Sequence, residues 1–277
     1  QRFKKNYGCF AGKIKMKIPF SKPSINLNVL KDIGKIIKSG WLIEGRYTAE
    51  FESRFARYIG VKHAVAASSG TTALFLALKG LGIKDGDEVI VPSLTFVASA
   101  NSIIHAGAKP VFAEIDKDTF NLNPESIKEK ITKRTKAVMP VHLYGQSCDM
   151  DEINEIAEKN GLKVIEDSAQ AVGALYKNRK TGSFGDAGCF SFHPAKNLTT
   201  GEGGIITTNS KDISKIAKIL KNHGMEKSAL QLMKGIVADR KFIEIGYNFR
   251  LPEINATIGI SQLKDIEKNN KLRIEKA

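Results

Sequence analysis

The sequence predicts an α/β fold with a mainly parallel sheet that is covered by helices on both faces. Short apolar runs alternate with longer amphipathic runs along most of the chain, and this alternation is typical of a parallel sheet. The run 88–92 is apolar at successive positions, as expected for a strand buried on both sides. Because ligands gather at the carboxyl ends of parallel strands, we expect the functional site near His142, Asp167 and the loop before Lys196.

The first two expected helices have clear stop signals. Residues 28–39 carry apolar side chains at helical spacing before Gly40, and residues 47–58 do so before Gly60. The other expected strands are 61–67, 110–115, 136–141, 163–167, 189–192 and 205–208, and the other expected helices are 68–81, 93–105, 124–131, 149–159, 212–221 and one that starts near 252. The pattern assigns no element to residues 228–241.

Composition excludes several classes of protein. The 277-residue chain is 42% hydrophobic and 26% charged, as in ordinary globular proteins. It has neither the run of roughly 18 apolar residues that crosses a membrane nor a signal-peptide core, which makes the cytoplasm the default location. Its three cysteines and five histidines show no ligand spacing, so we expect reduced thiols and no metal site.

The net charge of +14 is distributed unevenly. Residues 1–17 hold six basic residues and no acid, lack periodicity, and are predicted to be a disordered basic extension. The remaining charges are dispersed among acids on expected helices, which is typical of a solvated surface. No recognition helix, ribonucleoprotein string or zinc finger is present, so we expect no nucleic-acid partner. A basic surface suits an anionic substrate such as a nucleotide-linked sugar.

A lysine and two carboxylates form the first candidate site. Glu166 and Asp167 end one expected strand, and Lys196 lies in a loop between the next strand and a Gly-Glu-Gly-Gly turn. A lysine amine can form a Schiff base, and a carboxylate can hold a positive charge on a cofactor ring. Taken alone, Lys196 is more simply a surface charge. Adjacent strand residues point to opposite faces, and spacing does not choose between Glu166 and Asp167.

The second candidate site lies at the start of an expected helix. Residues 68–72, Ser-Ser-Gly-Thr-Thr, place hydroxyl groups around a glycine there. Free amide groups, the positive end of the helix dipole and hydroxyls together can bind an anion such as a phosphate. The same residues also form an ordinary helix cap. They are not a Walker loop, because no Gly-Lys-Ser/Thr follows, and no Gly-x-Gly-x-x-Gly points to a nicotinamide enzyme.

Three strings carry a family resemblance. EDSAQAVGA at 166–174, CFSFHPAKNLTTGEGG at 189–204 and GYNFRLPEINATIG at 246–259 resemble the DegT/DnrJ/EryC1 (StrS) family of pyridoxal-phosphate-dependent sugar aminotransferases. The resemblance extends from about residue 18 to the end of the chain. It implies the fold-type-I transferase fold, with a cofactor-binding large domain at 18–252 and, at 253–277, the start of a helix toward a C-terminal small domain that is largely missing.

The resemblance also implies roles for individual residues. Lys196 forms the Schiff base and moves protons, Asp167 binds the ring nitrogen, and Gln170 binds the ring hydroxyl. The side chain of Phe96, which would otherwise be read as core, stacks on the ring. Ser191 binds the phosphate together with the helix start. The full set of implied cofactor-binding residues is Gly70, Thr71, Thr72, Phe96, Asp167, Gln170, Ser191, Lys196 and Asn248.

The implied reaction is a two-step transamination. An amino acid, most plausibly L-glutamate, donates the amino group, and a keto sugar carried on a nucleotide accepts it, giving an amino sugar for a surface polysaccharide, a glycan or an antibiotic. Asn248 matches an asparagine that reaches the phosphate from the neighbouring subunit, which implies a homodimer with shared active sites. From residues alone, Asn248 would be read as a turn former.

Two alternatives stay open. Sugar dehydratases of the same family have a histidine in place of the Schiff-base lysine. The presence of Lys196, with His193 three residues earlier, disfavours that reading. The other alternative is a truncated homologue that binds the cofactor or a partner without catalysis.

Overall fold

The computed structural model describes residues 19, 21–226 and 241–276. The predicted basic extension at 1–17 and nearly all of the unassigned segment 228–241 lie outside this described part. In the described residues, no helix is both long enough and apolar enough to cross a bilayer.

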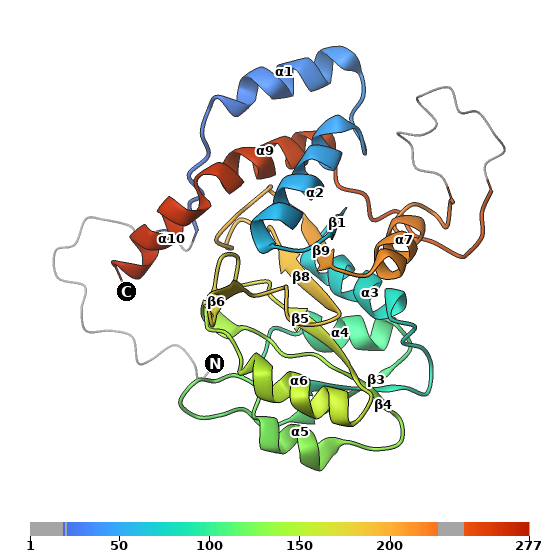
Figure 1. Ribbon diagram of the computed structural model, residues 1–277. Coiled ribbons are helices and arrows are strands. Elements are labelled where there is room, and N and C mark those ends of the chain that lie inside the picture. Colours follow the sequence, from blue (N-terminus) through green and yellow to red (C-terminus); the bar gives the residue numbers. More distant parts are fainter. Residues whose placement is uncertain (1–18, 20, 227–240, 277) are drawn as a thin grey trace, which may run out of the picture.

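A seven-stranded sheet forms the centre of the molecule (Figure 1). Its order is β1-β9-β8-β5-β4-β2-β3, and β9 alone runs antiparallel to both of its neighbours. The predicted mainly parallel sheet is therefore confirmed. The strands are β1 (His63–Ala67), β2 (Glu88–Pro92), β3 (Lys109–Ala113), β4 (Thr135–Val138), β5 (Lys163–Asp167), β8 (Ala187–Ser191) and β9 (Gly204–Thr208).

Helices cover both faces of this sheet, as predicted. One face packs against α3, α4 and α7. The other packs against α2 and α9 over β1, β8 and β9, and against α5 and α6 over β2, β4 and β5. The helices are α1 (Val29–Ser39), α2 (Arg46–Ile59), α3 (Gly70–Gly80), α4 (Ala98–His105), α5 (Pro124–Lys130), α6 (Met150–Lys159), α7 (Lys211–Leu220), α9 (Glu253–Lys264) and α10 (Ile266–Ile274), with a 3-10 turn η1 (Leu143–Gly145).

The alternation of side chains along β1 shows how one strand serves both layers. Val65 and Ala67 belong to the core beneath α3, whereas Ala64 and Ala66 belong to the core beneath α2. This is the two-residue period of a strand buried on both faces. Buried apolar area of this kind provides the main driving force for the fold.

The helix ends follow the expected glycine signals. Gly40 and Gly60 adopt φ values of 69° and 89°, which side chains with a Cβ rarely tolerate, and they end α1 and α2. The predicted last helix is interrupted, because α9 ends at Lys264 and α10 begins at Ile266. Ala256 and Ile260 on α9 lie in the core with α2, so this helix packs on the same unit as the sheet.

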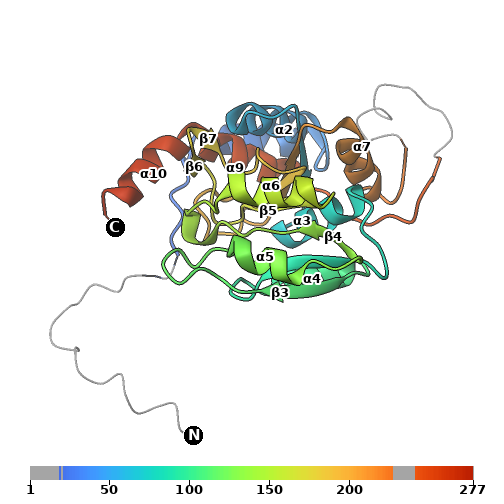
Figure 2. The ribbon, with the colours of Figure 1, turned by 60° about the horizontal axis from the view of Figure 1, so that its bottom comes forward.

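A short hairpin was not predicted from the sequence. β6 (Leu175–Tyr176) pairs with β7 (Arg179–Lys180) across a two-residue turn, in which Lys177 and Asn178 both have positive φ. The helix α10 extends away from the sheet beside this hairpin (Figure 1 and Figure 2), and Lys180 forms an ion pair of 3.7 Å with Glu267 there.

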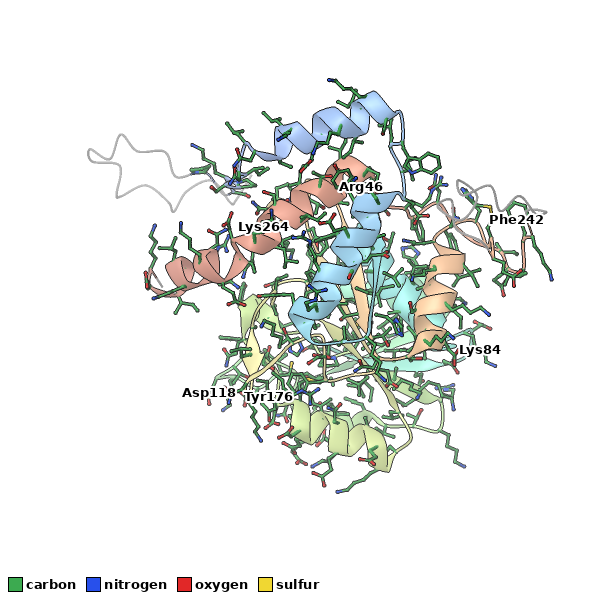
Figure 3. The ribbon with its side chains drawn as sticks, turned by 45° about the horizontal axis from the view of Figure 1, so that its top comes forward. Arg46, Lys84, Asp118, Tyr176, Phe242 and Lys264 are labelled. Atoms are coloured by element: carbon green, nitrogen blue, oxygen red, sulfur yellow. The ribbon has the colours of Figure 1, made fainter. Side chains whose placement is uncertain are left out.

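Charged side chains line a cavity between α1, α2 and α9. Figure 3 shows α1 above α9, and Arg46 at the start of α2 lies with Lys264 at the end of α9 in the cavity between these helices. In the central sheet only β9 is reversed. The carboxyl ends of the other strands, among them β1, β2, β5 and β8, therefore lie at the same end of the sheet. The loops after these strands, and the starts of α3 and α4, therefore meet at one end of the sheet.

Candidate active site

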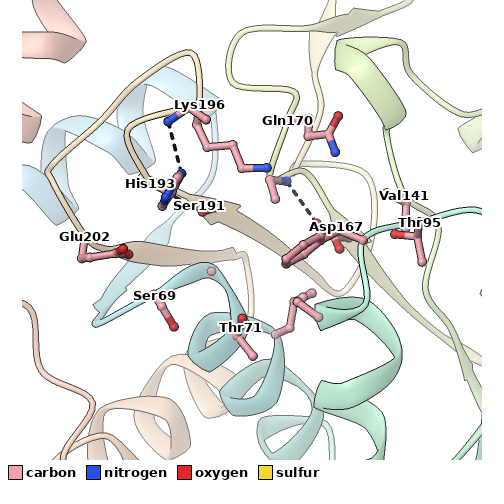
Figure 4. Close-up of a pocket in the computed structure, with 16 residues that line it drawn as sticks. Ser69, Thr71, Thr95, Val141, Asp167, Gln170, Ser191, His193, Lys196 and Glu202 are labelled. Atoms are coloured by element: carbon pink, nitrogen blue, oxygen red, sulfur yellow. Dashed lines mark hydrogen bonds between the residues drawn. The ribbon is translucent and has the colours of Figure 1, made fainter. Parts of the chain in front are cut away.

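A cavity of about 350 Å³ (the first cavity) opens where these strand ends meet (Figure 4). Seven of the nine predicted cofactor-binding residues line it, while Thr72 and Asn248 do not. Its lining consists of Ser69, Gly70, Thr71, Leu74, Thr95, Phe96, Ala98, Val141, Asp167, Ala169, Gln170, Ser191, His193, Ala195, Lys196 and Glu202. The two sequence candidates, the lysine region and the helix start, thus belong to one site.

Asp167 lies at the floor of the cavity as the last residue of β5, with 5% of its surface exposed. Its main chain is fixed by neighbouring strand ends, since its amide donates to the Pro140 carbonyl at 2.8 Å and its carbonyl accepts from the His142 amide at 3.1 Å. Burial raises the pKa of the Asp167 carboxyl. Hydrogen bonds from Ser99 and Ala169 and the charge of Lys196 oppose this rise without cancelling it.

Ser99 is a site residue that the sequence did not reveal. Its hydroxyl donates to Asp167 Oδ2 at 2.7 Å, while the Ala169 amide donates to Asp167 Oδ1 at 3.1 Å. Thr95, which lines the cavity, lies 2.8 Å from Ser99 through their hydroxyl oxygens. Ser99 is fully buried as the second residue of α4. In the expected helix 93–105 Thr95 and Ser99 would share a face, being four apart, but α4 begins only at Ala98 and Thr95 lies before it.

The neighbouring carboxylate, Glu166, has a different task. It is fully buried on the other side of the strand, where it accepts from the amides of Gly182, Phe184 and Gly185 at 2.7–2.8 Å. His142 also contacts it, with Nε2 lying 3.0 Å from Glu166 Oε2. Since three amides and a ring nitrogen occupy its oxygens, Glu166 holds the 182–185 loop against the sheet and does not reach the cavity.

The side chain of His142 also lies on the Glu166 side of the sheet, away from the first cavity. Its Nδ1 accepts from the Cys148 amide at 3.1 Å, so the ring proton lies on Nε2 and is donated to Glu166. The side chain is fully buried and does not line the first cavity. His142 therefore lies at a strand end, as expected, but its ring binds Glu166 and the Cys148 amide inside the protein and does not face the cavity.

Lys196 reaches the cavity from the loop that follows β8. Its backbone amide donates to the His193 carbonyl at 2.9 Å, and its side chain extends into the cavity on the side of Asp167 (Figure 4). Burial lowers the pKa of the Lys196 amine, and the negative charge of Asp167 partly opposes that change. A larger fraction of this amine is neutral, and hence nucleophilic, than of a surface lysine.

The start of α3 forms a cradle beside Lys196. Ser69 caps this helix by accepting from the Thr72 amide at 3.1 Å. The amides of Gly70 and Thr71, two residues that line the cavity, are among those that a helix start leaves without a partner inside the helix. A Cβ on Gly70 would lie 2.6 Å from Ser191 Cβ, so a glycine is needed for this approach. The Ser191 hydroxyl stands opposite, and the three groups suit an anion.

Thr72, which is predicted to bind the cofactor, is not among the residues that line the first cavity. Its hydroxyl accepts from the Ser69 amide at 3.0 Å and donates to the Ser69 carbonyl at 2.9 Å. Those bonds complete the helix cap and hold it away from the cavity lining. Thr72 therefore shapes the cradle indirectly, by fixing Ser69.

The remaining predicted residues lie at the rim or beyond it. Phe96 lines the cavity with 67% of its surface exposed. Gln170 also lines it, and its Oε1 accepts from the Tyr144 amide at 2.9 Å, so its amide nitrogen stays available as a donor. Asn248 lies outside the first cavity on the exposed surface, where its Oδ1 accepts from Arg250 Nε at 2.9 Å.

Fold and site together define the fold of a fold-type-I pyridoxal-phosphate-dependent transferase: a mainly parallel sheet whose strand ends bring a lysine, an aspartate and the start of a helix into one cavity. The chain belongs to the DegT/DnrJ/EryC1/StrS aminotransferase family, whose sequence profile matches residues 23–277. The resemblance inferred from the three sequence strings is thereby confirmed.

Named relatives and a solved structure agree with this membership. The chain is 46% identical to the spore coat polysaccharide biosynthesis protein SpsC of Bacillus subtilis, over 93% of this chain and 67% of that protein. It is 46% identical to the GDP-perosamine synthase of Caulobacter vibrioides, over 91% of this chain and 66% of that protein. Spr1654 of Streptococcus pneumoniae, solved in its PMP form, superposes with a TM-score of 0.85 at 34% identity, over 91% and 68% of the two chains.

All three matches cover only part of the matched protein. The chain spans about two thirds of the length of these three proteins, from 66% to 68%. The matched part includes every residue that lines the first cavity, because the family profile begins at residue 23.

Proposed function

We propose that this chain is the cofactor-binding part of a pyridoxal-phosphate-dependent aminotransferase that forms an amino sugar on a nucleotide carrier. The observation that carries the proposal is the pairing of Lys196 with Asp167 across one cavity that also holds the start of α3. Membership of an aminotransferase family and the names of the relatives, a GDP-perosamine synthase and a polysaccharide biosynthesis protein, support it.

The residues of the first cavity fit pyridoxal phosphate. The amides of Gly70 and Thr71 and the Ser191 hydroxyl suit its phosphate. Because Gly70 has no side chain, its backbone can lie close to Ser191, and both residues can contact the same phosphate. A buried carboxylate suits its ring nitrogen, and an amine suits its aldehyde. When bound, the cofactor supplies an aldehyde that condenses with amines and a ring that accepts the electrons released when a carbon loses its proton.

Asp167 would keep the proton on the ring nitrogen. Its carboxylate already accepts hydrogen bonds on both oxygens, from Ser99 and from the Ala169 amide, and these fix its orientation. A hydrogen bond to an ionised carboxylate contributes about 1.5–3 kcal/mol. In this position the aspartate would keep the ring cationic. A cationic ring is a better electron acceptor, so the α carbon of the amino-acid donor would lose its proton more easily.

Lys196 would have two tasks in sequence. Its amine, kept partly neutral by burial, first binds the cofactor and is then released when the amino-acid donor takes its place. The free Nζ would then be the group that accepts and returns the proton of the donor's α carbon. Phe96 would stack on the cofactor ring and limit the access of water, and the Gln170 amide nitrogen would donate to the ring hydroxyl.

Substrates and assembly belong to the same proposal. The donor is an amino acid, L-glutamate in the first instance, and the acceptor is a keto sugar on a nucleotide. Asn248, exposed and outside its own cavity, would reach the phosphate of a partner subunit in a homodimer. Residues 18–252 would form the cofactor-binding large domain, with the segment from 253 leading toward a second domain, in an enzyme of the cytoplasm.

The decisive test is the site of cofactor attachment. Purified chain mixed with pyridoxal phosphate should turn yellow, and borohydride should fix one cofactor on Lys196, as located by peptide mass spectrometry. Lys196→Ala should give no such adduct, whereas the surface control Lys177→Ala should behave as wild type. An adduct of equal yield in Lys196→Ala would refute the assignment.

Turnover separates this function from its two alternatives. The chain should convert L-glutamate to 2-oxoglutarate in the presence of a 3-keto or 4-keto nucleotide sugar and form the aminated sugar. Loss of a sugar hydroxyl without amino transfer would indicate a dehydratase. Cofactor binding without either reaction would indicate a non-catalytic chain.

A further inference from the structure

A second cavity, also of about 350 Å³, lies on the other side of the lysine loop. It is bounded by residues 21–24, by the loop 194–199 and by the helices α9 and α10. Ala195 and Lys196 line both cavities. Both residues therefore belong to the wall between the first cavity and this second one, and a group bound in the second cavity lies next to Lys196.

Hydrogen bonds between distant parts of the sequence build the second cavity. Ser21 Oγ donates to the Pro194 carbonyl at 2.7 Å, and Gln262 Nε2 donates to the Ser24 carbonyl at 2.6 Å. Asn270 on α10 donates to the Val172 carbonyl at 2.8 Å. The N-terminal segment, the lysine loop and the two last helices are thus tied to one another, and the space between them is a feature of the fold.

The lining of this cavity is positively charged and polar. It contains Lys22, Lys196 and Arg273, and among its described lining residues there is no aspartate or glutamate. Within the described part of the chain, neither Lys22 nor Arg273 has a carboxylate at ion-pair distance. Its other lining residues include hydroxyls and amides: Ser21, Ser24, Asn197, Thr199, Gln262 and Asn269.

Arg273 is oriented within this wall. Its Nη1 donates to Asn270 Oδ1 at 3.2 Å, and the guanidinium has four further N–H groups for a ligand. Arginine binds carboxylate and phosphate groups through two parallel hydrogen bonds, and lysine adds a point charge. The first cavity differs from the second, because its lining includes the acids Asp167 and Glu202.

We propose that the second cavity binds an anionic oxygen group, a carboxylate or a phosphate, of a substrate that reacts at Lys196. This inference rests on the proposed function. Two sources share the chemistry: the α-carboxylate of the amino-acid donor, which is attached to the reacting carbon, and the diphosphate of the nucleotide sugar. Lys22 and Arg273 hold the anion, so the substrate approaches Lys196 from the side opposite the phosphate cradle at Gly70.

Binding to the reduced protein tests this site apart from catalysis. Borohydride reduction of the pyridoxal-phosphate-treated chain fixes the cofactor in the first cavity and stops turnover, so the remaining anion binding reports the second cavity. L-glutamate and uridine diphosphate are titrated separately by calorimetry into wild type, Lys22→Gln and Arg273→Gln. Lys268→Gln is the matched control, since it removes an exposed charge on α10 outside the cavity lining.

We expect both cavity variants to weaken binding at least about tenfold, with the control within about twofold of wild type. A loss for glutamate alone identifies the donor carboxylate, and a loss for uridine diphosphate alone identifies the nucleotide. Arg273→Lys, which keeps the charge, should recover part of the affinity and guards against a folding defect. Equal affinities in all variants, or no binding of either probe by wild type, overturn the inference.

Failure of the proposed function has a different signature. It is the absence of a borohydride adduct on Lys196, and it is measured before any titration. In that case the same titrations are made on the untreated chain, in which Lys22 and Arg273 are equally present, and the same comparison of variants decides whether the second cavity binds anions.

Discussion

Replacing Ser99 by alanine tests how Asp167 is kept in its working state. The Ser99 hydroxyl is fully buried and lies 2.7 Å from Asp167 Oδ2, so no solvent replaces it readily. A hydrogen bond to a charged group is worth about 1.5–3 kcal/mol. Because this hydrogen bond stabilises the ionised form, Ser99→Ala should raise the pKa of Asp167 further.

The consequence for the cofactor follows from the protonation state of Asp167. A carboxylate that loses its donor is less stable in the ionised form, and only the ionised form holds the ring nitrogen as a cation. We expect Ser99→Ala to weaken pyridoxal phosphate binding by roughly 10- to 100-fold near neutral pH. Fluorescence or absorbance titration of the chain with the cofactor measures this constant over a range of pH.

The chain offers a close control for this experiment. Ser102 is on the same helix and is equally buried, but its hydroxyl donates to the Ser99 carbonyl at 2.9 Å within α4. Ser102→Ala should lose some stability and keep the cofactor affinity within about twofold, since no bond to Asp167 is lost. If Ser99→Ala binds the cofactor as tightly as Ser102→Ala at every pH, the Ser99 hydroxyl does not act on Asp167.

Three further changes have expected outcomes. Glu166→Gln should destabilise the chain by about 3 kcal/mol or more in urea unfolding, because it disturbs a buried carboxylate bound by three amides, while exposed Glu155→Gln should have little effect. Asp167→Asn should raise the Tm of the cofactor-free chain near neutral pH but lower cofactor affinity: the folded pKa of Asp167 is raised, so stability is lost as the pH rises from the unfolded pKa through the folded pKa. The rate of cofactor attachment should rise with pH and level off below 10.5, because the pKa of Lys196 is lowered; a plateau at 10.5 or above would contradict this.

Most of the fold could be predicted because its signals are local and repeated. Apolar runs of strand length alternate with amphipathic helices, and glycines such as Gly40 and Gly60 mark where helices end. The β6–β7 hairpin was missed because Lys177 occupies a turn position with positive φ, where glycine or asparagine is the usual signal. The break after Lys264 was missed because helix-forming residues continue on both sides of it.

The candidate site could be predicted only in part, for a physical reason. Lys196, Asp167 and the start of α3 stand at strand and helix ends, and the chain topology brings such ends together. Ser99 contacts Asp167 through side chains that are 68 positions apart, and no periodicity marks such a pair. The cap formed by Thr72 and Ser69 is local, but sequence alone does not say whether a hydroxyl faces its own helix or a ligand.

The two adjacent carboxylates show how one strand supplies both the support and the chemistry of this site. Successive side chains on β5 point to opposite faces, so Glu166 and Asp167 cannot share a partner. Glu166 meets amides and a histidine proton, and all of these compensate its charge within the protein. Asp167 keeps two donors and an open side toward Lys196. Its charge is the less compensated of the two, and it is therefore the one available to a cationic ring.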